Sequence, residues 1–168
     1  SSDDIYEHIF WHQEKFQNIL NVAPDLKDRT IIFNGVSKAY SMTGWRIGYA
    51  AGNKEIIKKM KTLQSQSTSC ASSVSQYAAI SALTQKCEEL PKMNAEYKER
   101  HDYVVKELNN IPGVTCRETD GTFYVFPSFT KYIEESQKIN NDDELAMYLL
   151  NEGKVAVVPG SAFGMSGH

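Results

Sequence analysis

The stretch "GVSKAYSMTGWRIGYAAG" spans residues 35–52 and holds a single lysine, Lys38, among small and hydroxyl-bearing residues. The preceding "RTIIFNG" is rich in β-branched and aromatic side chains and ends at Asn-Gly, which is typical of a strand that leaves into a loop. "WRIGYAAG" predicts a second strand, which would begin at Arg46. We therefore expect Lys38 on the loop between two strands, where open α/β sheets present groups to a crevice.

A lysine on a loop is most often a solvated charge, and that is the alternative for Lys38. The small neighbouring residues would nevertheless let a planar ligand approach, and a second cation, Arg46, follows eight positions later. A lysine amine becomes nucleophilic when it is desolvated or lies beside positive charge, and the guanidinium fork suits phosphate. A phosphorylated carbonyl compound would use both residues, and pyridoxal 5′-phosphate is such a compound.

The ring nitrogen of pyridoxal phosphate needs a carboxylate beside it to stay protonated as an electron sink. The segment "SSDDIYEH" at residues 1–8 offers two, Asp3 and Asp4, and this chemistry alone does not choose between them. Tyr6 in the same segment could hydrogen-bond the phenolic oxygen of the ring.

Four further segments carry apolar residues at helical spacing. The predicted helices cover residues 53–66, 72–84, 92–109 and 139–153. Asn53 is the expected N-cap of the first helix, and Pro91 marks a break before the third. The apolar stripe expected on the third helix consists of Tyr97, Tyr103, Val104 and Leu108.

Two β elements are predicted in the second half of the chain. A hairpin joins "VTCRET" to "TFYVFPSF" around an Asp120-Gly121 turn, and "KVAVVPG" forms a last short strand. The order of elements is α/β in the first half and α+β in the second. We expect a domain boundary near Pro91.

Composition limits the classes of partner. The 168 residues are 23% charged and 41% hydrophobic with a net charge of −3, and no basic block favours nucleic acid. No apolar run reaches about 18 residues, so we expect no membrane span. Three cysteines without CxxC spacing favour a reducing compartment and hence the cytoplasm. His8 and His12 are four apart but lack an evident third ligand, so we expect no metal site.

The motifs closely resemble the fold-type I, pyridoxal-phosphate-dependent aminotransferases of class I/II, in particular the bacterial aspartate/aromatic branch. "SDDIYEHI", "NGVSKAYSMTGWRIGYAAG", "QSQSTS", "GTFYVFP" and "KVAVVPGSAFG" come in the family order and cover essentially the whole chain. The resemblance implies an α/β fold in which residues 1–90 are the C-terminal part of the large α/β/α cofactor-binding domain. Residues 91–168 would be most of an α+β small domain, incomplete at its C-terminus.

The resemblance also implies roles for individual residues. Lys38 matches the catalytic lysine that holds the cofactor as a Schiff base, and Arg46 matches the arginine that binds its phosphate. The family's D-x-x-Y pattern matches Asp3, not Asp4, to the ring nitrogen, and Tyr6 to the phenolic oxygen.

Several features depart from the family pattern. Many relatives carry a phosphate-binding serine three residues before the lysine, where this chain has Gly35, and Ser37 is the candidate to replace it. "QSQSTS" lacks the arginine of relatives specific for dicarboxylic acids. A family member is well over twice this length, and the arginine for the substrate carboxylate is expected directly after His168. We therefore expect the chain to be a piece of a larger enzyme and, by itself, inactive.

The function implied by the resemblance is transfer of an amino group between an amino acid and a 2-oxo acid, in a homodimer. Two alternatives remain open at this point. One is a lyase of the same fold that performs β-elimination, and the other is a non-catalytic fragment or domain of such an enzyme.

Overall fold

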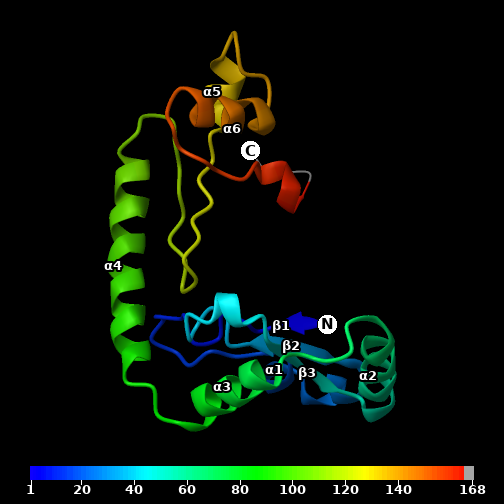
Figure 1. Cartoon of the computed structure of the whole chain (residues 1–168). Helices are drawn as coiled ribbons and strands as arrows, with labels where there is room; N and C mark the ends of the chain where they lie inside the picture. Colours follow the sequence, from blue (N-terminus) through cyan, green and yellow to red (C-terminus); the bar gives the residue numbers. More distant parts are fainter. Residues whose placement is uncertain (165–168) are drawn as a thin grey trace. The chain divides into compact units, whose positions relative to one another are not determined.

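A three-stranded mixed sheet organises the N-terminal part of the chain (Figure 1). β1 (Ser2–Asp3) runs parallel to β2 (Ile31–Gly35), and β2 runs antiparallel to β3 (Gly48–Gly52). In the register of the sheet, Asp3 lies opposite Phe33 and Gly35 lies opposite Gly48. The strand predicted in "RTIIFNG" and the α/β class are confirmed.

The prediction that the next strand begins at Arg46 is wrong. Thr43–Trp45 forms a short 3₁₀ turn, η2, and Arg46 follows it with φ 52° and ψ 50°, in the left-handed region. For a residue with a side chain this conformation costs about 1–3 kcal/mol and interrupts extended pairing. The strand therefore begins only at Gly48, and Arg46 lies on the same connection as Lys38.

The helices predicted from spacing in the first half are present. α2 (Lys54–Ser67) begins after Asn53, whose side chain accepts a hydrogen bond from the backbone N–H of Glu55 at 2.9 Å. α3 (Ser73–Thr84) buries Ser75 and Ala79, in keeping with close packing through small residues. Two shorter elements precede β2: α1 (Ile19–Val22) and the 3₁₀ segment η1 (Pro24–Arg29).

The structure is a computed structural model that describes residues 1–164. Its backbone contacts divide the chain into two units. The N-terminal unit consists of Ser1–Lys98 and Asp120–Thr122, and the C-terminal unit consists of Glu99–Thr119 and the residues from Phe123 onward. α4 (Glu89–Asn109) passes from one unit to the other.

The prediction that Pro91 precedes this helix is wrong. Pro91 lies in the first turn of α4. The N–H groups of a first helical turn have no intrahelical partner, so a proline there removes no hydrogen bond. Among the described residues, no helix combines the length and the apolarity that crossing a bilayer requires.

The apolar stripe predicted on α4 does not form the buried face of the helix in the C-terminal unit. His101 and Val105 are buried there, whereas Tyr103 is 66% exposed. Burial of a histidine is favourable only when its polar atoms are paired, and Nε2 of His101 accepts the backbone N–H of Thr119 at 3.1 Å. The buried face of α4 in this unit therefore includes a hydrogen-bonded histidine as well as Val105.

The predicted hairpin and last strand are wrong. Of the hairpin, one antiparallel bridge remains in the C-terminal unit, between Thr115 and Ser128. Residues 154–160 hold no strand, because Lys154 adopts a left-handed conformation and no neighbouring strand pairs with them in the described part of the chain. The remaining elements are α5 (Thr130–Glu135), α6 (Asp142–Asn151) and η3 (Gly160–Phe163).

Asn109 connects the end of α4 to the following segment. Its Nδ2 donates to the carbonyls of Val105 at 2.9 Å and Cys116 at 2.8 Å, and its Oδ1 accepts the N–H of Cys116 at 2.9 Å. Cys116 is buried, so these backbone groups have little access to water. The amide of Asn109 therefore satisfies both backbone groups of a core residue.

We expect Asn109→Ala to lower the free energy of unfolding of the complete protein by about 1–3 kcal/mol, because it leaves the backbone groups of Cys116 unpaired. Asn110→Ala is the matched control, because Asn110 is likewise exposed and the bonds to Cys116 come from Asn109; it should change stability by less than about 0.5 kcal/mol. Denaturant titration measures both, and equal losses would contradict the role given to Asn109.

Candidate functional site

The connection between β2 and β3 carries the cationic residues singled out in the sequence. Lys38 lies in a tight turn, in which its carbonyl accepts the N–H of Ser41 at 3.1 Å. Val36 and Ala39 on either side of it are 0% and 2% exposed, while Lys38 itself is half-buried. Two buried neighbours therefore fix the backbone of the turn that presents the amine.

β1 places a carboxylate at the edge of the sheet where β2 ends and the Lys38 turn begins. Asp3 ends β1, which is parallel to β2, so both strands have their carboxyl ends at one edge. The Asp3 side chain is exposed, and its Oδ1 accepts the N–H of Ile5 at 3.2 Å. Asp4, by contrast, is 5% exposed and accepts a hydrogen bond from the Ser2 hydroxyl at 2.7 Å. Of the two carboxylates, Asp3 is therefore the more exposed.

Arg46 is exposed and lies on the connection that also holds the Lys38 turn. Its Nη1 donates to the carbonyl of Thr43 at 2.8 Å, which restrains the side chain while its other donors remain available for an anion. Ser37 and Tyr6 are half-buried. Lys38, Ser37 and Arg46 thus share one connection, and Asp3 and Tyr6 lie on the segment that enters from the adjacent strand.

The glycine that replaces the expected serine has a packing reason. A Cβ on Gly35 would lie 3.3 Å from the Cα of Gly48 and 3.3 Å from the carbonyl oxygen of Ile47, closer than most real Cβ contacts. Glycine at this position therefore lets the two strands approach closely just before the lysine turn.

A family comparison decides the class of the chain. Residues 1–168 match the model of the family "Aminotransferase class I and II". The chain belongs to this family. The resemblance inferred from the motifs is thereby confirmed, and members of the family depend on pyridoxal phosphate.

Members of this family with known names resemble the chain closely in sequence. It is 46% identical over 168 residues to an aspartate aminotransferase of Rhizobium meliloti, and 48% identical over 169 residues to an aspartate/prephenate aminotransferase of Cereibacter sphaeroides. These alignments cover 98% of the chain but 41% and 42% of the relatives. The chain therefore spans less than half the length of the relatives it matches.

Solved structures give the same result. The crystal structure of the aspartate aminotransferase from Rhizobium meliloti has a TM-score of 0.89 at 46% identity, over 97% of this chain and 42% of that one. An aromatic aminotransferase from Pyrococcus horikoshii has a TM-score of 0.87 at 34% identity, over 99% and 43%. The fold of this chain is thus that of the matching part of an aminotransferase.

The structure adds a polar cluster that the sequence did not reveal. Oε1 of Glu7 accepts a hydrogen bond from Nδ2 of Asn34 at 2.7 Å and lies 3.6 Å from Nε2 of His8. The His8 ring packs edge-on against Tyr40, with ring centroids 5.9 Å apart. Glu7 directly follows Tyr6, but no spacing rule joins residues 7 and 34, and only the pairing of β1 with β2 brings them together.

The pKa values of two tyrosines beside this cluster are both raised. Burial raises the pKa of Tyr40, and the nearby Cys87 and Glu7 raise it further. Burial also raises the pKa of Tyr49, with smaller contributions from Glu7 and Tyr40. The neutral phenols are thus favoured next to the lysine turn.

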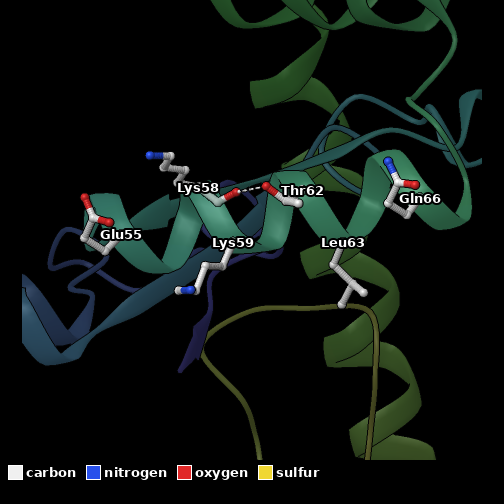
Figure 2. A pocket seen from close by; sticks show the side chains of 6 residues that line it. All are labelled: Glu55, Lys58, Lys59, Thr62, Leu63 and Gln66. Carbon is white, nitrogen blue, oxygen red and sulfur yellow. Dashed lines mark hydrogen bonds between the residues drawn. The ribbon is translucent and has the colours of Figure 1, made fainter.

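A shallow hollow elsewhere on the chain does not belong to this site. Figure 2 shows it along one helix, α2, where the hydroxyl of Thr62 donates to the Lys58 carbonyl at 3.1 Å. It is lined by Glu55, Lys58, Lys59, Thr62, Leu63 and Gln66. None of the predicted site residues takes part. Within residues 1–164, no three side chains of metal-binding type come together.

We expect the Tyr40 phenol of the complete protein to ionise at higher pH than a free tyrosine derivative. Because its folded-state pKa lies above the unfolded value of about 10, the stability it contributes is present below that pH and is lost as the pH rises through the folded pKa. The tyrosinate absorbance that disappears in Tyr40→Phe measures this ionisation. A component that ionises at or below the pH of the free derivative would contradict the expectation.

Proposed function

We propose that the complete protein is a pyridoxal-phosphate-dependent aminotransferase that moves an amino group from an amino acid to a 2-oxo acid. The observation that carries this proposal is the half-buried Lys38 on a turn held by two buried residues, with Arg46 on the same connection and Asp3 at the adjacent strand end. The names of the relatives, aspartate and aspartate/prephenate aminotransferase, favour aspartate as the amino donor. Because residues 64–69 lack the arginine of relatives specific for dicarboxylic acids, another residue would have to bind its side-chain carboxylate.

The residues present fit the cofactor. When bound, pyridoxal phosphate supplies a carbonyl for attachment of amines and a protonated ring that accepts electrons from the substrate Cα. Such a group needs an amine, a carboxylate and an anion-binding donor. Lys38, Asp3 and Arg46 offer these groups, and Asp3 and Arg46 are exposed.

Each residue then has a distinct task. The Lys38 amine would hold the cofactor and would carry the proton removed from the substrate Cα. The Asp3 carboxylate keeps the proton on the ring nitrogen. Arg46 and Ser37 bind the phosphate, and Tyr6 hydrogen-bonds the phenolic oxygen.

The wider organisation is part of the same proposal. We assign residues 1–90 to the C-terminal part of the large cofactor-binding domain and residues 91–168 to the small domain. The family resemblance supports a cytoplasmic homodimer. It also supports amino acids and 2-oxo acids as the substrates.

The role of Lys38 is testable by chemical trapping. In the complete protein, borohydride reduction in the presence of pyridoxal phosphate should fix the cofactor on Lys38, as peptide mapping by mass spectrometry would show. Lys38→Ala should lower turnover by about 10²–10⁴-fold or more, because the proton carrier is lost, whereas Lys59→Ala on exposed α2 should not. A modified Lys59 or Lys61 would reject the assignment, and release of ammonia without a new amino acid would favour the lyase.

The role of Asp3 is tested against its neighbour. Asp3→Asn should reduce kcat/KM at least about tenfold more than Asp4→Asn, because only the former removes the negative charge that holds the ring proton. Asp4→Asn is a matched control, since an amide oxygen can still accept the Ser2 hydroxyl. Steady-state kinetics with circular dichroism as a folding check decides between them, and equal effects would reject this register.

A further inference from the structure

The backbone link between the Asp3 segment and β2 is short. It consists of the register pairs Ser2 with Ile32 and Asp3 with Phe33, followed by a hydrogen bond from Asp4 N–H to the Phe33 carbonyl at 2.9 Å. Beyond Asp4 the chain leaves the sheet in a tight turn, in which Glu7 N–H donates to the Asp4 carbonyl. Sheet pairing therefore ends before the position of Tyr6.

A side-chain contact extends this link by three residues. The carboxylate of Glu7 accepts a hydrogen bond from Nδ2 of Asn34 at 2.7 Å, and the pair is partly buried although its members are 27 positions apart. A hydrogen bond with one charged partner is about twice as strong as a neutral one. The Glu7 side chain is 30% exposed, so water weakens the contact only in part.

The oxygen of the Asn34 amide makes a hydrogen bond as well. Oδ1 accepts the backbone N–H of Gly35 at 2.7 Å. A carboxylate can only accept and a backbone N–H can only donate, so the orientation of the amide is fixed by its two partners. Asn34 thus connects the Glu7 carboxylate to the last residue of β2.

Gly35 is the base of the lysine turn. It is buried, its backbone packs on Gly48, and the fully buried Val36 follows it directly. Because close-packed backbone does not deform gradually, a shift of Gly35 is passed on to Lys38 three residues later.

We propose that Glu7 and Asn34 form a clasp that positions the Lys38 turn relative to the segment of Asp3 and Tyr6. The proposal deepens the proposed function, since these are the two segments that would hold opposite sides of the cofactor. Glu7 is a positioning residue and acts through Asn34 and Gly35. The other titratable groups that face Glu7 are His8, Tyr40 and Tyr49.

Three variants of the complete protein separate the clasp from general stability. Asn34→Asp places a carboxylate against Glu7 and breaks the clasp by repulsion. Combining it with Glu7→Gln restores the hydrogen bond in the opposite direction, because the amide at position 7 now donates to the carboxylate at position 34. That carboxylate can still accept the Gly35 N–H. The control is Asn94→Asp, because Nδ2 of Asn94 makes a comparable bond to the Phe10 carbonyl at 2.9 Å in the same unit.

The first readout is amide hydrogen exchange in the cofactor-free protein. We expect Asn34→Asp to speed exchange of the amides at residues 35–42 at least about tenfold, and the double variant to restore protection. Asn94→Asp should leave these amides unchanged. Unchanged exchange in Asn34→Asp, or no recovery in the double variant, would overturn the clasp whether or not the protein binds pyridoxal phosphate.

The second readout is the pH dependence of the absorption band of bound pyridoxal phosphate. Asn34→Asp should shift this profile and slow borohydride trapping on Lys38 about tenfold, and Glu7→Gln should reverse both in the double variant. Asn94→Asp should lower stability without moving the profile, and equal shifts in both single variants would overturn the proposal. If wild-type protein traps no cofactor on Lys38, the proposed function fails, whereas the exchange experiment still judges the clasp.

Discussion

The pairing of Gly35 with Gly48 is the constraint on which the N-terminal unit depends. It closes the β2–β3 connection at a fixed point. The twelve residues of this connection, 36–47, include both cationic candidates, Lys38 and Arg46. Since β1 joins the same central strand in parallel, the acidic segment arrives at the edge where this connection begins. The absence of a side chain at both glycines makes this close approach possible.

The sequence was sufficient where local chemistry decides the structure. β2 and α2 were predictable because a β-branched run and an asparagine cap act within a few residues. The lysine segment was sufficient to find the family, because its small residues and its two cations occur in a specific order. The same segment holds the candidate site residues Ser37, Lys38 and Arg46, whereas Asp3 and Tyr6 lie in residues 1–8.

The remainder depends on contacts that are distant in the sequence. The buried face of α4 includes His101, which is hydrogen-bonded to Thr119, whereas apolar spacing pointed to Tyr103. Residues 154–160 have strand-like composition but lack a strand to pair with in the described chain, and a strand without a partner leaves its backbone groups unpaired. The contact of Glu7 with Asn34 requires the register of the sheet, which neither residue reveals by its neighbours.

The division of the chain at Asp120–Thr122 has a consequence for biosynthesis. Trp11 N–H donates to the Asp120 carbonyl and Thr122 N–H donates to the Ile9 carbonyl, both at 2.8 Å, and a side chain on Gly121 would collide with Ile9. These partners are separated by more than a hundred residues, so a loop of that length must close before the bonds form. A nascent chain that leaves the ribosome from its N-terminus therefore cannot complete the N-terminal unit until the first segment of the C-terminal unit, Glu99–Thr119, has been translated.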